Sequence, residues 1–197
     1  MDPTKDVLHR YLRSHREAVL WKLEGLSERD QRWPATPSGT NLLGLVKHLA
    51  FTEAGYFGLV FGRPPRWAPQ WLLDIATGAD EEPNSDMWAR PDESPDELVA
   101  LYRRIAAHSD ATIAELPLDA PGRVPWWGDE GDTTLHHVLV HMIAETARHA
   151  GHADVVRESI DGSRGLAEDN DNLPDADEAW WDRYVDRLRD VAEAADR

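Results

Sequence analysis

The segment Glu145-Thr-Ala-Arg-His149 places a carboxylate and an imidazole four residues apart within an apolar helical pattern. At roughly 100° per residue, this spacing puts both side chains on one helix face. The same face carries the apolar residues of the pattern, which are Leu135, Val138, Met142, Ala153 and Val156. An ionised Glu that points into a protein must be paired, protonated or bound to a metal, because burial alone is costly. The pair therefore predicts a divalent metal site, since carboxylate oxygen and imidazole nitrogen are both zinc ligands.

Spacing alone leaves both the metal and its third ligand open. Glu–His pairs at this spacing also occur as ordinary contacts on helix surfaces. A third ligand must come from another helix, and two residues compete for the role: His48 flanks one apolar stripe, and His15 lies near the centre of another. His141 and His152 lie at the two edges of the Glu–His face, where each is an alternative ligand or a supporting group.

Four apolar stripes at helical spacing predict the elements that must position these residues. We expect helices over residues 2–25, 40–61, 94–116 and 133–160. The connector 62–91 is rich in proline and tryptophan, so it should pack over the helices and contain a short helix near 70–75. No run of alternating strand residues is convincing. The predicted fold class is all-α, a four-helix bundle with long connecting loops.

A last amphipathic segment lies beyond these helices. Asp161-Gly162 ends the fourth predicted helix, and an acidic stretch follows. Trp181, Tyr184 and Leu188 then repeat at helical spacing, which predicts a C-terminal extra helix. We expect one domain over residues 1–162. Residues 163–197 should form an acidic linker and an amphipathic tail helix, packed on the bundle or on a dimer partner.

Composition excludes several classes of partner and chemistry. Lys and Arg number 21 against 37 Asp and Glu, so the formal net charge of −16 repels nucleic-acid phosphates and anionic lipid surfaces. We expect neither nucleic acid nor membrane as a partner. The absence of cysteine excludes disulfides and a protein thiol nucleophile, so any thiol chemistry needs a small-molecule thiol. With no apolar run that could span a bilayer and no signal-peptide core at the N-terminus, the expected location is cytoplasmic.

Three stretches of the chain resemble the DinB/YfiT-like superfamily. They are Gly25-Leu-Ser-Glu-Arg29, the segment 34–48 that ends in Leu-Val-Lys-His, and Glu145-Thr-Ala-Arg-His-Ala-Gly-His-Ala-Asp154 with the following Arg157-Glu158. The third is typical of an actinobacterial branch of "mini-circle protein" relatives of unknown function. The resemblance extends to about residue 160. It implies a DinB-like four-helix bundle, often dimeric, with a three-ligand metal site between helices.

The resemblance also selects among the candidate ligands. Many relatives use three histidines, whereas the middle position here is Glu145. This departure is similar to mycothiol-dependent maleylpyruvate isomerase, in which a His-Glu-His set binds zinc. Position by position, the resemblance implies His48, Glu145 and His149 as ligands of zinc, with nickel or another divalent metal as alternatives. It assigns His15 a core or pocket role.

The leading functional expectation is a metal-dependent thiol S-transferase. A cofactor thiol of the mycothiol type would be activated on the metal and would attack a small electrophile. One alternative is a metal-dependent hydrolase that uses bound hydroxide, with Glu53 or His141 as acid–base helper; another is a non-catalytic metal-binding, stress-associated protein. Trp126 and Trp127 either wall a substrate pocket or fill the core. Catalytic and cofactor-binding residues stay unassigned, because the resemblance does not name the substrate.

Overall fold

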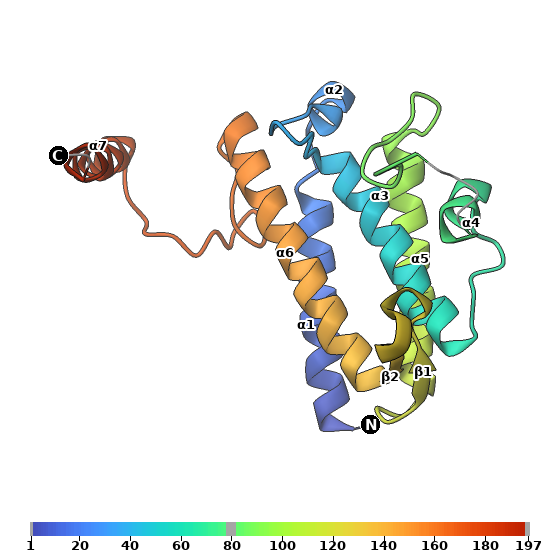
Figure 1. Ribbon diagram of the computed structural model, residues 1–197. Coiled ribbons are helices and arrows are strands. Elements are labelled where there is room, and N and C mark those ends of the chain that lie inside the picture. Colours follow the sequence, from blue (N-terminus) through green and yellow to red (C-terminus); the bar gives the residue numbers. More distant parts are fainter. Residues whose placement is uncertain (1, 78–81, 196–197) are drawn as a thin grey trace.

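Four long helices form the body of the protein (Figure 1). The computed structural model describes residues 2–77 and 82–195. The long helices are α1 (Pro3–Trp21), α3 (Leu42–Glu53), α5 (Pro95–Glu115) and α6 (Leu135–Asp161). Helix α1 packs against α6, α3 packs against α5, and α3 also contacts α6. The prediction of an all-α fold is confirmed.

Each long helix begins at a residue that caps its first turn. The side chains of Asp2, Asn41, Ser94 and Thr134 accept hydrogen bonds from backbone N–H groups two or three residues further on. These bonds satisfy donors that the first helical turn leaves without a partner. Ser94 and Glu97 form a complete capping box. Such local signals explain why all four helix starts lie within two residues of their predicted positions.

The first two predicted helices differ from the structure in detail. Helix α1 ends at Trp21, and a short helix α2 (Glu28–Arg32) occupies the following connector. The second predicted helix does reach Phe61, but its winding changes on the way. Helix α3 continues into a π-helical turn η1 (Ala54–Gly58) and a 3₁₀ turn η2 (Leu59–Phe61). A π-helical turn re-aims the side chains around it and is frequent at functional sites.

A short β-hairpin, which no alternating run of residues in the sequence indicates, precedes α6. Strand β1 (Pro121–Arg123) pairs antiparallel with β2 (Asp132–Thr134) around the 3₁₀ segment η3 (Pro125–Glu130). Strands of three residues are too short to show an alternating sequence pattern. The hairpin presents η3, and with it Trp126 and Trp127, beside the N-terminal half of α6.

The core consists of apolar clusters with a buried ion pair between the two largest. On α1, Leu12 belongs to one cluster and Val19 to the other, and Arg16 lies between them. The Arg16 guanidinium donates to both carboxylate oxygens of Glu53 at 2.8 and 2.7 Å. The Tyr102 hydroxyl donates to the same carboxylate at 3.0 Å. This pairing compensates the charge of Glu53, whose exposed fraction is 0%.

The connector after η2 packs over the helices, as predicted. It contains α4 (Gln70–Thr77), and Trp67 and Trp71 lie against the core. Residues 78–81 of the predicted connector lie outside the described residues. The segment from residue 82 to Ser94 returns along α3 and leads into α5.

The predicted tail helix also forms, as α7 (Glu178–Ala194). Figure 1 shows it apart from the four long helices, at the end of an extended segment. None of its residues is buried, although the Arg164 guanidinium lies 4.7 Å from the ring centroid of Trp181. The boundary at residue 162 and the docking of this helix on the bundle or on a second subunit stay predictions. No helix in the described part of the chain is long and apolar enough to cross a membrane.

Candidate metal site

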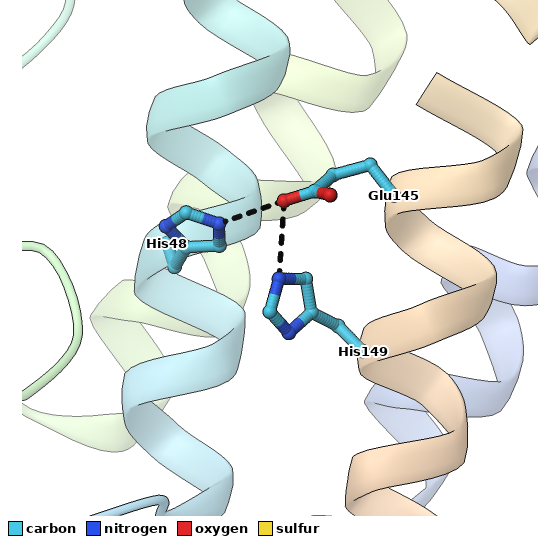
Figure 2. Close-up of side chains that lie close together, drawn as sticks. All are labelled: His48, Glu145 and His149. Atoms are coloured by element: carbon cyan, nitrogen blue, oxygen red, sulfur yellow. Dashed lines mark hydrogen bonds and ion pairs between the residues drawn. The ribbon is translucent and has the colours of Figure 1, made fainter. Parts of the chain in front are cut away.

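His48 on α3 faces Glu145 and His149 on α6, and all three side chains converge (Figure 2). Nε2 of His48 lies 3.2 Å from Oε1 of Glu145, and Nε2 of His149 lies 3.1 Å from the same oxygen. One ligand atom from each residue lies within 4.8 Å of the other two. The structure therefore brings together the three residues that the resemblance selected.

The donor atoms of this cluster suit a divalent cation. Two imidazole nitrogens and one carboxylate oxygen form the ligand set of several catalytic zinc sites, which keep a further coordination position open. Among the described residues, His15 and His152 lie outside this cluster of three possible metal ligands. His15 is half-buried on α1, and the exposed His152 touches His149 only through its ring, at a centroid distance of 5.4 Å.

Asp86 supports His48 from the opposite side of its ring. Nδ1 of His48 lies 2.6 Å from Oδ2 of Asp86. In the neutral imidazole that a metal requires, a carboxylate at this position keeps the proton on Nδ1, so that the lone pair of Nε2 points toward the cluster. Nδ1 of His149, by contrast, is buried and has no hydrogen-bond partner in the described part of the chain. His48 is thus the ligand candidate whose orientation is fixed by a carboxylate.

Gly44 lets the loop that carries Asp86 approach α3. A Cβ atom at Gly44 would overlap the carbonyl oxygen of Met87, so no larger residue fits here without moving the loop. The side chain of Asn41 donates to the same carbonyl at 3.2 Å, and Lys47 donates to the carbonyl of Trp88 at 3.1 Å. Because Gly44 lies one turn before His48, this contact places Asp86 beside the imidazole. Sequence analysis missed both Asp86 and Gly44, since neither lies in a distinctive spacing.

The charges of the cluster shift its pKa values in different directions. Burial would lower the pKa of His48, but hydrogen bonds to Asp86 and Glu145 and their negative charges raise it to about 9. The hydrogen bond from His48 and the charges of both imidazoles lower the pKa of Glu145 to about 2. Burial, together with repulsion from His48, lowers the pKa of His149. In the metal-free protein at neutral pH, Glu145 is therefore an anion and His48 is a cation, so a metal ion that binds here must displace a proton from His48.

The cluster adjoins a cavity of about 700 Å³, whose wall includes Glu145 and His141. This volume is typical of small-molecule sites. Trp126 is also part of the wall. The sequence had left open whether Trp126 and Trp127 line a pocket or fill the core, and Trp126 lines the pocket. Glu53 is not available as an acid–base helper, because both its oxygens are engaged by Arg16 in the core. Sequence spacing could not reveal the cavity, which forms between α3, η1, α4, η3 and α6.

Comparison with known proteins identifies the family of the chain. No curated protein matches the chain. The family model described as mycothiol S-transferase, a DinB/YfiT-like family, matches residues 7–162. The matched range contains most of α1, the whole of α3, α5 and α6, and all three clustered side chains. The chain belongs to the mycothiol S-transferase family.

Proposed function

We propose that this protein is a metal-dependent S-transferase that joins a small thiol of the mycothiol type to a small electrophile. One observation carries the proposal: His48, Glu145 and His149 bring their ligand atoms within 4.8 Å of one another, and Glu145 also lines the cavity. A cation and a substrate could therefore meet at one carboxylate. Membership of the mycothiol S-transferase family supports the choice of thiol.

In this proposal each group of residues has its own task. His48, Glu145 and His149 hold a divalent cation, zinc in the first instance and nickel as an alternative. Such a cation supplies positive charge that favours the thiolate form of a thiol at neutral pH. Asp86 keeps His48 in the ligating tautomer. The cavity wall excludes water and holds the electrophile close to the sulfur.

The proposal is tested by anaerobic titration of the cobalt-substituted protein with mycothiol. A thiolate-to-cobalt charge-transfer band should appear and saturate, and the zinc-loaded protein should form a thioether from mycothiol and an apolar electrophile. Absence of both the band and the conjugate would reject the transferase assignment.

Histidine variants provide the matched controls. His48→Ala and His149→Ala should each lose most of the bound metal, together with the charge-transfer band. His136→Ala removes an exposed histidine from the first turn of the same α6 helix and should keep both. Full metal retention in His48→Ala or His149→Ala would contradict the ligand assignment.

The hydrolase alternative has one observation in its favour. His141 lies in the cavity wall, and burial lowers its pKa, so its imidazole is mostly neutral at pH 7 and able to accept a proton. Turnover of esters or amides without thiol, lost in His141→Gln, would favour this function over the transferase. Metal binding without activity in either assay would instead favour the non-catalytic metal-binding protein.

A further inference from the structure

Tyr56 lines a cavity that is otherwise mostly apolar, and its side chain carries a hydroxyl group. It lies on the π-helical turn η1 and is 7% exposed. Most of the wall is aliphatic or aromatic, including Phe51, Leu59, Pro65, Leu72, Ile75 and Trp126. No Lys or Arg of the described residues lines it. The hydroxyl is therefore one of a few polar groups that a bound molecule can meet.

Two tryptophans fix the direction in which this hydroxyl can act. The indole N–H groups of Trp126 and Trp127 both donate to the Tyr56 oxygen, at 3.1 and 3.2 Å. A phenol oxygen that accepts twice has used its acceptor capacity and keeps only its own O–H for further bonding. Among the described residues, this O–H donates no hydrogen bond to an acceptor. The nearby His141 makes a ring contact with Tyr56, and the two ring centroids lie 4.6 Å apart. Tyr56 is thus a fixed and unused donor, and the two indoles strengthen the bond that it can donate.

The cavity wall limits what the acceptor can be. No Lys or Arg of the described residues lines the cavity, so a negatively charged ligand would find no basic side chain to pair with. A sugar-based thiol such as mycothiol carries many hydroxyl groups, which an apolar wall would leave without partners. The cavity is therefore suited to the electrophile rather than to the thiol.

We infer that Tyr56 is a specificity-determining residue: its hydroxyl recognises an oxygen atom, such as a ketone oxygen, on an uncharged and largely apolar ligand bound in this cavity. The inference rests on the proposed function only in taking that ligand to be the electrophile. The hydrogen bond itself requires neither thiol nor turnover.

The inference is tested with an inert ketone and a hydrocarbon of similar shape. Acetophenone with an isotope-labelled carbonyl and ethylbenzene are bound to the full-length protein, first metal-loaded and then after chelation of the metal. The carbonyl stretching band should lie at lower frequency than in an apolar solvent, with and without metal. In Tyr56→Phe the band should return to its position in apolar solvent. Acetophenone should bind to Tyr56→Phe up to about tenfold more weakly than to the wild type, because one hydrogen bond is lost. Ethylbenzene should bind to both proteins with the same affinity.

Two further variants keep the test decisive if Tyr56→Phe does not fold. Trp127→Phe removes one N–H from the Tyr56 oxygen, and Trp127 is not among the described residues that line the cavity. It should reduce the band shift, whereas an unchanged shift would count against the inference. His141→Leu removes the other candidate donor and should leave the shift intact.

Three results would overturn the inference. The first is an unshifted carbonyl band in the wild type, and the second is a shift that is lost in His141→Leu but kept in Tyr56→Phe. The third is an equal loss of affinity for acetophenone and ethylbenzene in Tyr56→Phe, which would show that Tyr56 has a packing role only. Absence of mycothiol transfer with an intact Tyr56-dependent shift would instead reject the proposed function and leave this inference standing.

Discussion

Replacing Asp86 by Asn tests how much the carboxylate behind His48 contributes to metal binding. The change keeps the size of the side chain and its ability to accept a hydrogen bond, but it removes the negative charge. The contact is short, 2.6 Å from Nδ1 to Oδ2, and the exposed fractions of the two side chains are 16% and 17%. Solvent therefore screens this interaction only weakly.

The expected loss follows from the role of such partners in metal sites. Removing a carboxylate that orients a metal-bound imidazole typically weakens metal binding about 10- to 100-fold, or about 1.4 to 2.7 kcal/mol. A second effect acts in the opposite direction. Asp86 helps to raise the pKa of His48 to about 9, so at neutral pH a metal ion must displace a proton from this ring. Asp86→Asn lowers that pKa and weakens the competition from protons.

The two effects separate when the metal titration is repeated at different pH values. A chelator of known affinity competes for zinc with the wild type and with Asp86→Asn, near pH 7 and above pH 9. Above a pH of about 9, the His48 pKa, the ring is largely neutral in both proteins, so the full deficit should appear. Near pH 7 the deficit should be smaller, because the variant gains from weaker proton competition.

An acidic residue of the same loop supplies the control. Asp92 is exposed, and Asp92→Asn removes the same charge from the chain without touching His48. It should bind zinc like the wild type. Equal affinities of wild type and Asp86→Asn above pH 9 would refute the orienting role of Asp86. An equal loss in Asp92→Asn would attribute the effect to overall charge.

The loop contact and the buried ion pair lead to three further predictions. Gly44→Ala should push the Asp86 loop away from α3, which should destabilise the protein by about 1–3 kcal/mol and weaken zinc binding. The control Gly151→Ala, whose Cβ meets nothing within 4 Å, should change neither stability nor zinc affinity in this way. Equal results for the two variants in unfolding and zinc titrations would contradict the contact at Gly44. Arg16→Met should cost about 3–5 kcal/mol in urea unfolding, because it leaves the buried carboxylate of Glu53 without its partner, and an unchanged midpoint would argue against that pairing. For Asp110, burial raises the pKa, but the His9 hydrogen bond and the Arg16 charge lower it below 3.8. Asp110→Asn should therefore lower the unfolding free energy at neutral pH, and this difference from the wild type should vanish as the pH falls through the folded-state pKa; a difference that is the same in acid as at neutral pH would exclude this linkage.

The parts of the fold that depend on local sequence were predictable. Capping residues such as Ser94 and Thr134 predicted helix starts because the bonds that they form lie within one turn. The spacing of Glu145 and His149 predicted a shared face for the same reason. The choice of His48 over His15 came from the family resemblance alone, since both lie in helical apolar stripes. In the structure His48 lies beside Glu145, and its role as a metal ligand stays a prediction.

The parts that depend on distant contacts were not predictable from spacing. Asp86 meets His48 across 38 positions of the chain, and that contact depends on a loop held against Gly44. The short hairpin before α6 forms through backbone pairing rather than through a side-chain pattern. The π-helical turn at Tyr56 continues the apolar stripe of α3, so periodicity does not distinguish it from an α-helix. These features shape the cavity, which explains why the clustering of His48, Glu145 and His149 was easier to predict than the cavity beside it.

Anomalous diffraction from zinc-loaded crystals tests the metal assignment most directly. A single strong peak is expected between α3 and α6, at about 2.0–2.2 Å from Nε2 of His48, Nε2 of His149 and a carboxylate oxygen of Glu145. The direct hydrogen bonds from the two histidines to Glu145 should then be replaced by bonds to the ion. Absence of a peak at this position, with His48 and His149 still hydrogen-bonded to Glu145 in the presence of saturating zinc, would contradict the account.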